Sequence, residues 1–462
     1  MLMTQASSNS IPAAGVLSEA RQLRLPVAGR GTKEERKADT SLQLGVTFQE
    51  SRRHGVHRWY PYVEGFSASY VKETLARQER CANVYDPFGG AGTTQLVASC
   101  LGLPSFYSEI NPFMAFATET KVHSASWAKR EWKQFSKIAH RFRDLLTEET
   151  LGERGSRTSL TSYETAFPAR DFFEESSLRQ LLAARDLAIE LTEDLPEIRS
   201  LLLLACAANA VHSSNMTRRA DLRRRRSDEY KTRVVDVAKF IRESVMNMVT
   251  DIQLLPQEMA ETRHVSQDCR ELGDEFVEAF DLAITSPPYL NGTNYFRNTK
   301  IELWLLGFIS SEAELSRYRA RAIAGGINNI SKSRGGYEAF PEVERVASRL
   351  DVCARDGRIP RLVRHYFSDM SEVLAAVHRA LRPGRRFVLD IGDSRYYGVH
   401  VPTDELLVAV SRQVGFELEH RRVLARRLSY DKTPLVQVEL TLRKPRVVRR
   451  RMPPLQVSAS QQ

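Results

Sequence analysis

A short proline-rich stretch carries the residue types best suited to chemistry in this chain. Ser286, Pro287, Pro288 and Tyr289 follow the apolar run at residues 280–284. Apolar residues that lead into a polar turn are typical of a buried strand ending at the carboxyl edge of an α/β sheet, where such folds bind ligands. Successive prolines fix φ and lack an N–H, so the loop's carbonyls stay free to accept hydrogen bonds, while Ser286 adds a hydroxyl and Tyr289 an aromatic face. The loop suits a planar ring that bears an amino group.

A glycine-rich stretch forms the second motif. Residues 84–94 read Val-Tyr-Asp-Pro-Phe-Gly-Gly-Ala-Gly-Thr-Thr and precede an apolar, helix-like segment. A strand, a glycine turn and a helix bring a nucleotide-like ligand close to the backbone. No lysine follows the glycines, so a phosphate-free cofactor fits better than a phosphate group. About twenty residues on, Glu109 follows a strand expected at 105–108, the place where an acidic residue usually receives ribose hydroxyls.

Together the two motifs resemble the signature pair of the S-adenosylmethionine-dependent amino-methyltransferases of DNA, which methylate cytosine N4 or adenine N6. The likeness covers most of residues 55–445. It implies a Rossmann-like α/β fold with a mixed, mostly parallel seven-stranded sheet, S-adenosyl-L-methionine as cofactor and double-stranded DNA as substrate. It also implies catalytic roles for Ser286, Pro287, Pro288 and Tyr289. The cofactor-binding residues that it implies are Tyr60, Tyr62, Asp86, Phe88, Gly90, Gly92, Thr93, Glu109, Asp268 and Cys269.

The chemistry of the target explains these residue types. An exocyclic amine is a poor nucleophile because its lone pair is delocalised into the ring. The Ser286 side chain and the Pro287 carbonyl would hold the N–H bonds and turn the lone pair toward the methyl group, with Tyr289 stacked on the base. Serine at the first motif position resembles the cytosine-N4 group, so cytosine N4 is favoured over adenine N6.

The alternatives to this interpretation are other nucleic-acid methyltransferases and a binding protein without catalytic activity. Methylation of a cytosine ring carbon needs a thiolate, normally presented after a proline, and none of the five cysteines follows a proline. Amino-methyltransferases of tRNA or rRNA share the glycine turn and the Pro-Pro-Tyr loop, although no RNA-binding module is recognisable. A catalytically silent nucleic-acid-binding subunit could keep the fold for its shape alone, but the intact glycines and the intact Ser-Pro-Pro-Tyr argue against it.

Composition limits the partners and the compartment. A chain of 462 residues with 42% hydrophobic content can bury a large core, and its net charge of +10 favours an acidic partner, most commonly nucleic acid. Five scattered cysteines without a Cys-x-x-Cys pair predict no disulfide framework and no metal site. We expect a soluble, cytoplasmic and nucleoid-associated protein without a membrane partner. A restriction or defence protein is a further expected partner.

The pattern along the chain predicts an interrupted methyltransferase domain. We expect disordered tails at 1–45 and 446–462, the second of them basic, and an aromatic cofactor loop with the first part of the methyltransferase domain at 46–122. A large helical insertion at 123–263 and the second part of the domain at 264–445, with a loop insertion at 309–362, complete the chain. The helical insertion contains the densest positive cluster, from which we expect DNA phosphate contacts. These residues are Arg218, Arg219, Arg223, Arg224, Arg225 and Arg226.

Overall fold

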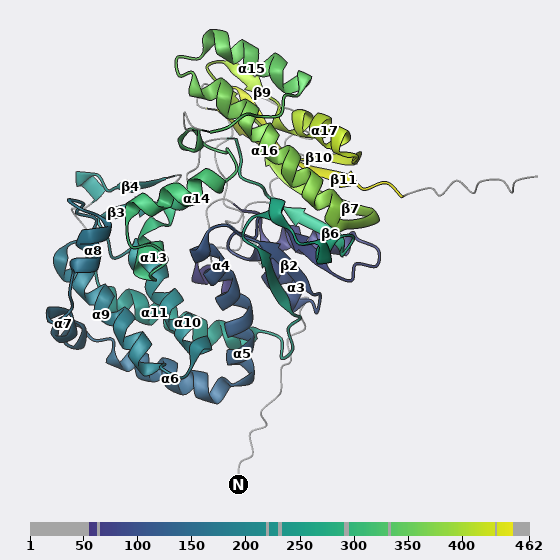
Figure 1. The fold of residues 1–462 in the computed structure, drawn as a ribbon. Coiled ribbons are helices and arrows are strands. Elements are labelled where there is room, and N and C mark those ends of the chain that lie inside the picture. Colours follow the sequence, from purple (N-terminus) through teal and green to yellow (C-terminus); the bar gives the residue numbers. More distant parts are fainter. Residues whose placement is uncertain are drawn as a thin grey trace, which may run out of the picture. The chain divides into compact units, whose positions relative to one another are not determined.

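Short apolar runs alternate with amphipathic helices along the chain, and in the computed structural model they form a seven-stranded sheet covered by helices (Figure 1). The model describes residues 55–446 apart from 62–64, 219–220, 230–232, 291–294, 331–333 and 430–431. The sheet strands are β1 (Val84–Asp86), β2 (Ser105–Ser108), β5 (Thr262–Ser266), β6 (Phe280–Thr285), β7 (Leu381–Gly392), β10 (Glu417–Leu428) and β11 (Pro434–Arg443).

The strand order is β10-β11-β7-β6-β1-β2-β5. The strands from β7 to β5 pair in parallel, whereas β11 is antiparallel to both β7 and β10. The predicted α/β fold with a mixed, mostly parallel seven-stranded sheet is therefore confirmed. Strand β1 has β2 on one side and β6 on the other, so the chain reverses its direction of travel across the sheet at this point. Open α/β sheets bind ligands beside such a switch point.

Helices cover both faces of the sheet, as expected for a parallel sheet buried on both sides. Alternate residues of β1 enter different apolar clusters, because successive side chains of a strand point to opposite faces. Val84 packs in a cluster with residues of α2 and α3, and Tyr85 packs in a cluster with residues of α16 and α17. Outside the insertion, the helices include α2 (Ala68–Ala76), α3 (Thr93–Cys100), α4 (Pro112–Glu119), α16 (Arg358–Ala380) and α17 (Thr403–Val414).

The predicted helical insertion lies between β2 and β5. Its core is continuous with residues around the amino end of α4, including Phe113, so it packs against the sheet-bearing part within one apolar cluster. Its helices are α5 (Ala125–Arg130), α6 (Trp132–Leu145), α7 (Glu148–Ser156), α8 (Thr161–Ala166), α9 (Glu175–Leu191), α10 (Pro196–Ala210) and α11 (Val237–Leu254). A two-stranded antiparallel hairpin, β3 (Met216–Arg218) with β4 (Leu222–Arg224), interrupts the helices and carries much of the arginine cluster.

A second group of helices lies between β6 and α16. The segment at 309–362, expected to be a loop, is instead largely helical. Leu315 and Leu350 on two of its helices are buried and drive this packing. The helices between β6 and α16 are α12 (Tyr295–Asn298), α13 (Lys300–Leu305), α14 (Leu315–Arg321) and α15 (Pro341–Cys353).

Short helical turns and one small hairpin complete the described part of the chain. The turns are η3 (Gly55–Trp59), the π-helix η4 (Thr120–Ser124), η5 (Ser227–Glu229), η6 (Cys269–Glu271), η7 (Asp274–Phe276), η8 (Glu312–Glu314) and η9 (Ile327–Asn329). The hairpin pairs β8 (Ser394–Tyr396) with β9 (Val399–Val401). Among the described helices, none combines the length and apolar character needed to span a bilayer. The predicted tails at 1–45 and 446–462 fall outside the described residues, except for Arg446.

Candidate active site

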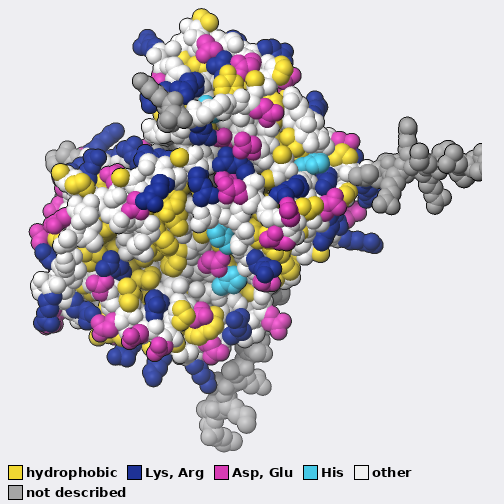
Figure 2. All heavy atoms as spheres, viewed as in Figure 1, with side chains coloured by type: hydrophobic (Ala, Val, Ile, Leu, Met, Phe, Trp, Pro, Cys, Tyr) yellow, Lys and Arg dark blue, Asp and Glu magenta, His cyan; other side chains and the backbone are white. Residues whose placement is uncertain are grey.

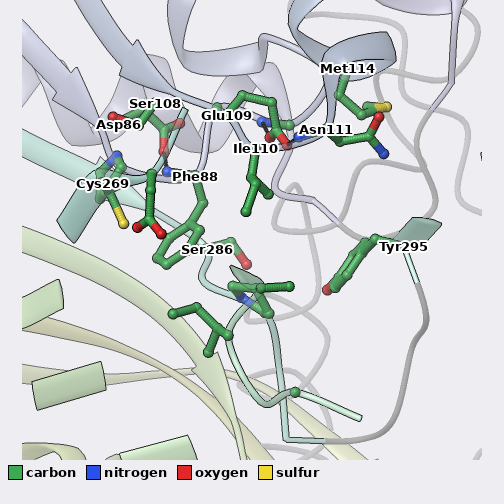
Figure 3. Close-up of a pocket in the computed structure, with 18 of the residues that line it drawn as sticks. Asp86, Phe88, Ser108, Glu109, Ile110, Asn111, Met114, Cys269, Ser286 and Tyr295 are labelled. Carbon is green, nitrogen blue, oxygen red and sulfur yellow. Dashed lines mark hydrogen bonds between the residues drawn. The ribbon is translucent and has the colours of Figure 1, made fainter. Parts of the chain in front are cut away.

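The two sequence motifs meet at one edge of the sheet. Val84 of β1 pairs in parallel with Leu282 of β6, so the loops that follow both strands leave from the same carboxyl edge. The glycine loop, residues 87–92, and the active loop, residues 286–290, open into one pocket of about 1170 Å³, a volume that includes its opening to solvent. Figure 3 shows Ser286 across the cavity from Glu109, with Tyr295 on a further side.

The Asp86 carboxylate ties the two loops together. One of its oxygens accepts hydrogen bonds from the Phe88 N–H at 3.0 Å and from the Thr285 hydroxyl at 2.6 Å. The other accepts from the Thr94 hydroxyl at 2.7 Å. Burial raises the pKa of Asp86 to about 6, although these hydrogen bonds oppose the shift. Asp86 therefore fixes the end of β1 to the end of β6 and to α3.

The glycine loop depends on three glycines for three different reasons. Gly90 has a φ of +52° and lines the pocket, and a Cβ there would meet only the Phe88 carbonyl oxygen, at 3.8 Å, so a side chain would be strained by the backbone and would narrow the pocket. A Cβ on Gly89 would lie 2.6 Å from the Tyr107 ring, and one on Gly92 would lie 2.8 Å from the Thr118 hydroxyl oxygen. Gly92 does not line the pocket but is the N-cap of α3, with a φ of +78°.

Glu109 braces the glycine loop from the neighbouring strand. One carboxylate oxygen accepts the Gly90 N–H and the other accepts the Asn111 N–H, both at 2.8 Å. Burial raises the pKa of Glu109 to about 7, and the backbone hydrogen bonds oppose the shift. The carboxylate lies in the pocket wall, and carboxylate oxygens accept hydrogen bonds from ligand hydroxyls.

The active loop is held at three points. Thr285 bonds to Asp86, the Leu290 carbonyl accepts from the hydroxyls of Ser394 and Tyr396, and the Tyr289 hydroxyl donates to Asp390 at 3.0 Å. Burial raises the pKa of Asp390 to about 6. These contacts fix the loop against β7 and the hairpin that follows it.

Only part of the active loop faces the pocket. Ser286 and Pro288 line it, whereas Pro287 is buried and Tyr289 points to Asp390, with the Arg427 guanidinium 5.9 Å from its ring centroid. The structure thus brings Ser286 together with the glycine loop and places Tyr289 behind it.

Asp268 and Cys269 follow β5 and line the pocket. The Asp268 carboxylate forms a bidentate pair with the Arg270 guanidinium, with N···O distances of 2.9 and 2.7 Å. Burial raises the pKa of Asp268, but the hydrogen bonds from Arg270 outweigh it, and the net shift is downward. A ligand amine would therefore meet a carboxylate that stays ionised. The free thiol of Cys269 is buried.

Of the predicted cofactor ligands, Phe88 and Thr93 line the pocket, as do Asp86, Gly90 and Glu109. Tyr60 is buried outside the lining, where its hydroxyl donates to Glu302 at 3.1 Å. Tyr62 lies outside the described residues.

The arginine cluster divides in the structure. Arg218 turns inward to Tyr60 and Glu302, and Arg219 lies outside the described residues. Arg223 pairs with Glu229 at 2.9 Å, and Arg224 pairs with Asp171. Arg225 is half-buried and Arg226 is exposed. Figure 2 shows basic side chains, with acidic ones among them, over the part of this face that carries the β3–β4 hairpin.

Several pocket residues have no signal in the two motifs. Tyr295 and Phe296 come from α12, Arg321 from the end of α14 and Phe66 from the segment before α2. Tyr295 and Phe296 follow the active loop in the sequence, and both reach the pocket. Arg321 is brought in by the fold of the second insertion, which nothing local in the sequence predicts.

Comparison with known proteins gives two similar relatives. The type II methyltransferase M.AvaI of Nostoc sp. (strain PCC 7120) is 23% identical over 406 residues, which cover 82% of this chain and 83% of that protein. The type II methyltransferase M.BsoBI of Geobacillus stearothermophilus is 23% identical over 422 residues, which cover 80% of this chain and 81% of that protein. The resemblance to methyltransferases that the two motifs indicate agrees with these relatives, both of which are named type II methyltransferases.

Two further comparisons add nothing to this relation. No protein-family model matches the chain. A SAM-dependent methyltransferase from Methanosarcina mazei is 9% identical over 81% of this chain and 97% of that chain, with a TM-score of 0.27. A TM-score this low carries no argument about the fold, which rests on the strand order of the chain itself.

Proposed function

We propose that this chain is an S-adenosylmethionine-dependent DNA methyltransferase that modifies an exocyclic amino group, with cytosine N4 as the favoured target. The observation that carries the proposal is the Asp86–Thr285 hydrogen bond of 2.6 Å, which joins the glycine loop and the active loop over one pocket. Relatives of type II methyltransferase function over four fifths of the chain support it. The cytoplasmic, nucleoid-associated location and a restriction partner belong to the same proposal.

The pocket fits the cofactor in shape and in charge. Gly90 leaves open space that a side chain would fill, and Phe88, Ile110 and Met114 supply apolar lining. Glu109 would hold ribose hydroxyls, and the ionised Asp268 would accept from the adenine amine. When bound, S-adenosylmethionine supplies an electrophilic methyl group.

Residues of the active loop would prepare the target amine. The Ser286 hydroxyl would accept one N–H and the Pro287 carbonyl the other, so that the nitrogen becomes pyramidal and its lone pair is removed from conjugation with the ring. Orientation of this kind can lower a barrier by about 7–11 kcal/mol. A base inside a duplex must first be flipped out, at a cost of a few kcal/mol that stacking in the pocket offsets.

Tyr295 is the aromatic residue proposed to stack on the base. Its side chain lines the pocket on a different side from Ser286 (Figure 3), whereas Tyr289 is held away by Asp390. Tyr289 then acts as a positioning residue, because its hydrogen bond to Asp390 fixes the loop that carries Ser286. In a Tyr289→Phe variant we expect transfer to weaken less than in Ser286→Ala.

The central test separates base positioning from cofactor binding. Ser286→Ala should lower methyl transfer to DNA by about 100-fold or more, a loss typical of removing one hydrogen-bonding group that acts on the reacting atoms. Cofactor affinity, measured by calorimetry, should change little, because the hydroxyl acts on the base. Ser156→Ala, at an exposed serine of α7, is the matched control. An equal loss of cofactor affinity in Ser286→Ala would count against the assignment.

Product analysis decides the target atom and the substrate class. Digestion of methylated DNA to nucleosides and mass spectrometry distinguishes N4-methylcytosine, which we expect, from N6-methyladenine. Transfer to tRNA or rRNA in place of DNA would favour an RNA amino-methyltransferase. Cofactor binding without transfer to any nucleic acid would favour a silent binding subunit.

A further inference from the structure

Arg218 occupies a different environment from the exposed arginines of its cluster. Its guanidinium donates to the Tyr60 hydroxyl at 3.0 Å and to the Glu302 carboxylate, and only 17% of the side chain is exposed. Glu302 is buried at 1% exposure in α13. An arginine whose guanidinium is bound to a buried carboxylate is poorly placed to contact a DNA phosphate. Arg218 is therefore better explained by a role other than phosphate contact.

Tyr60 is the junction between the hairpin and the glycine loop. Its hydroxyl donates to Glu302 at 3.1 Å and accepts from Arg218, whose guanidinium carbon lies 5.8 Å from the ring centroid. The ring also packs edge-to-face on Phe113, with centroids 4.8 Å apart. These contacts hold the buried Tyr60 side chain in one orientation. Its backbone carbonyl then becomes a fixed acceptor.

Lys121 connects that carbonyl to the glycine loop. Its ammonium donates to the Tyr60 carbonyl at 3.0 Å and to the Ala91 carbonyl at 3.1 Å, from within the π-helix η4. Ala91 lies between Gly90 and Gly92 and lines the pocket. Lys121 is only 1% exposed, and this burial lowers its pKa to about 7. Buried hydrogen bonds of this kind are stronger than exposed ones because the local dielectric is low.

The hairpin is also docked onto the helix that carries the far wall of the pocket. The Leu222 N–H of β4 donates to the Asn298 side chain at 2.6 Å, and Asp221 pairs with Arg297 at 3.0 Å. Both partners belong to α12, which supplies Tyr295 and Phe296 to the pocket. A displacement of the hairpin would therefore act on both the glycine loop and α12, which line different sides of the pocket.

We propose that Arg218, Tyr60 and Lys121 are positioning residues that couple the β3–β4 hairpin to the glycine loop, so that DNA on the hairpin tightens cofactor binding. This inference rests on the proposed function. Coupling of this kind is reciprocal, since DNA and cofactor must change each other's affinity by the same factor. The chain Arg218–Tyr60–Lys121–Ala91 supplies the contiguous physical contact that such coupling uses.

The experiment measures cofactor affinity with and without DNA. S-adenosylhomocysteine, which has no methyl group to transfer, is titrated calorimetrically into the protein alone and into the protein saturated with mixed-sequence duplex DNA. In the wild-type protein we expect DNA to tighten binding about fivefold or more, within the usual range of coupling between sites. Tyr60→Phe, which removes only the hydroxyl that Arg218 and Glu302 share, should reduce this factor below about twofold.

Two further variants test whether the contacts act as one chain. Lys121→Met breaks the contact at the glycine loop, and the double variant with Tyr60→Phe should lose no more coupling than either single variant. Tyr163→Phe is the matched control. Like Tyr60, Tyr163 is buried and its hydroxyl makes two hydrogen bonds, at 2.7 and 2.9 Å, but Tyr163 lies within the helical insertion. It should keep the wild-type factor, and melting temperatures verify that each variant is folded.

The outcomes separate this inference from the proposed function. Wild-type binding of both ligands with no coupling, or with coupling unchanged in Tyr60→Phe, would overturn the inference and leave the proposed function standing. Additive losses in the double variant would also overturn it, since independent contacts add. Failure of the wild-type protein to bind S-adenosylhomocysteine would overturn the proposed function, and the inference with it.

Discussion

At the scale of single residues, Asp86 has an environment that makes stability depend on pH. Its pKa in the folded protein is raised from 3.8 to about 6, chiefly by burial. The folded state therefore holds a proton in a pH range where the unfolded chain has already lost it. Between about pH 4 and pH 6 the contribution of Asp86 to the free energy of unfolding falls as pH rises, because the native state binds more protons there.

An Asp86→Asn variant should remove this dependence. The amide oxygen can still accept from Phe88 and Thr285, so the loops stay joined. We expect the free energy of unfolding of the variant, relative to the wild-type protein, to rise by about 3 kcal/mol from pH 4 to pH 7, from about 1.4 kcal/mol for each pKa unit. Urea denaturation across this pH range measures the difference. Parallel pH curves for the two proteins would show that Asp86 does not titrate as described.

The residues of the site were partly predictable because they follow strands. Asp86, Glu109, Asp268 and Ser286 each come at the end of a strand or just after one, and the structure places all four in the lining of one pocket. The contact between Asp86 and Thr285 spans 199 residues, and no local pattern predicts it. The orientation of Tyr289 depends on Asp390, in a strand whose position only the assembled sheet defines.

At the scale of elements, the glycine loop and the helix after it form a cradle whose backbone conformation can be tested. Gly90 and Gly102 both have positive φ, at +52° and +74°, and neither would bring a Cβ within 3.4 Å of other atoms. Alanine at either position should cost about 1–2 kcal/mol of stability, because L-residues are strained in that region. Gly90 lines the pocket and Gly102 does not.

Cofactor binding should therefore separate the two glycine variants. Gly90→Ala should weaken S-adenosylmethionine binding well beyond its effect on stability, since its methyl group would enter the pocket. Gly102→Ala should lose comparable stability and keep wild-type affinity. Thermal unfolding and calorimetry measure both quantities on each variant. Equal affinities in the two variants would mean that the ligand does not approach Gly90.

Elements with strong periodicity were predictable, and elements held by tertiary contact were not. The strand at 105–108 has the predicted bounds. The strands of the β3–β4 hairpin are three residues long and rich in arginine, so neither shows the alternation of a half-buried strand. Contacts with Asn298 and Arg297 hold the hairpin, and these residues follow the active loop.

At the scale of the whole molecule, net charge alone does not locate the DNA surface. The chain carries a net charge of +10, but acidic residues lie among the arginines of the hairpin. Glu229 pairs with Arg223, and Asp171 pairs with Arg224. A DNA phosphate must displace such acids, so the cluster contributes less than its formal charge. Exposed surface pairs are weak, at about 0–1 kcal/mol, and phosphates can replace them.

Salt dependence tests whether the hairpin is a DNA-binding surface. Each phosphate contact releases counterions, so the slope of log affinity against log salt is about −0.9 per contact on duplex DNA. Arg224→Ala with Arg226→Ala should weaken binding and make this slope shallower by about 2. Arg157→Ala with Arg242→Ala, at two other exposed arginines of the insertion, removes the same charge and should leave the slope unchanged. Asp171→Asn should tighten binding, since it frees Arg224 from a competing carboxylate. If both arginine pairs change the slope equally, the effect is one of net charge, and the hairpin is not the contact surface.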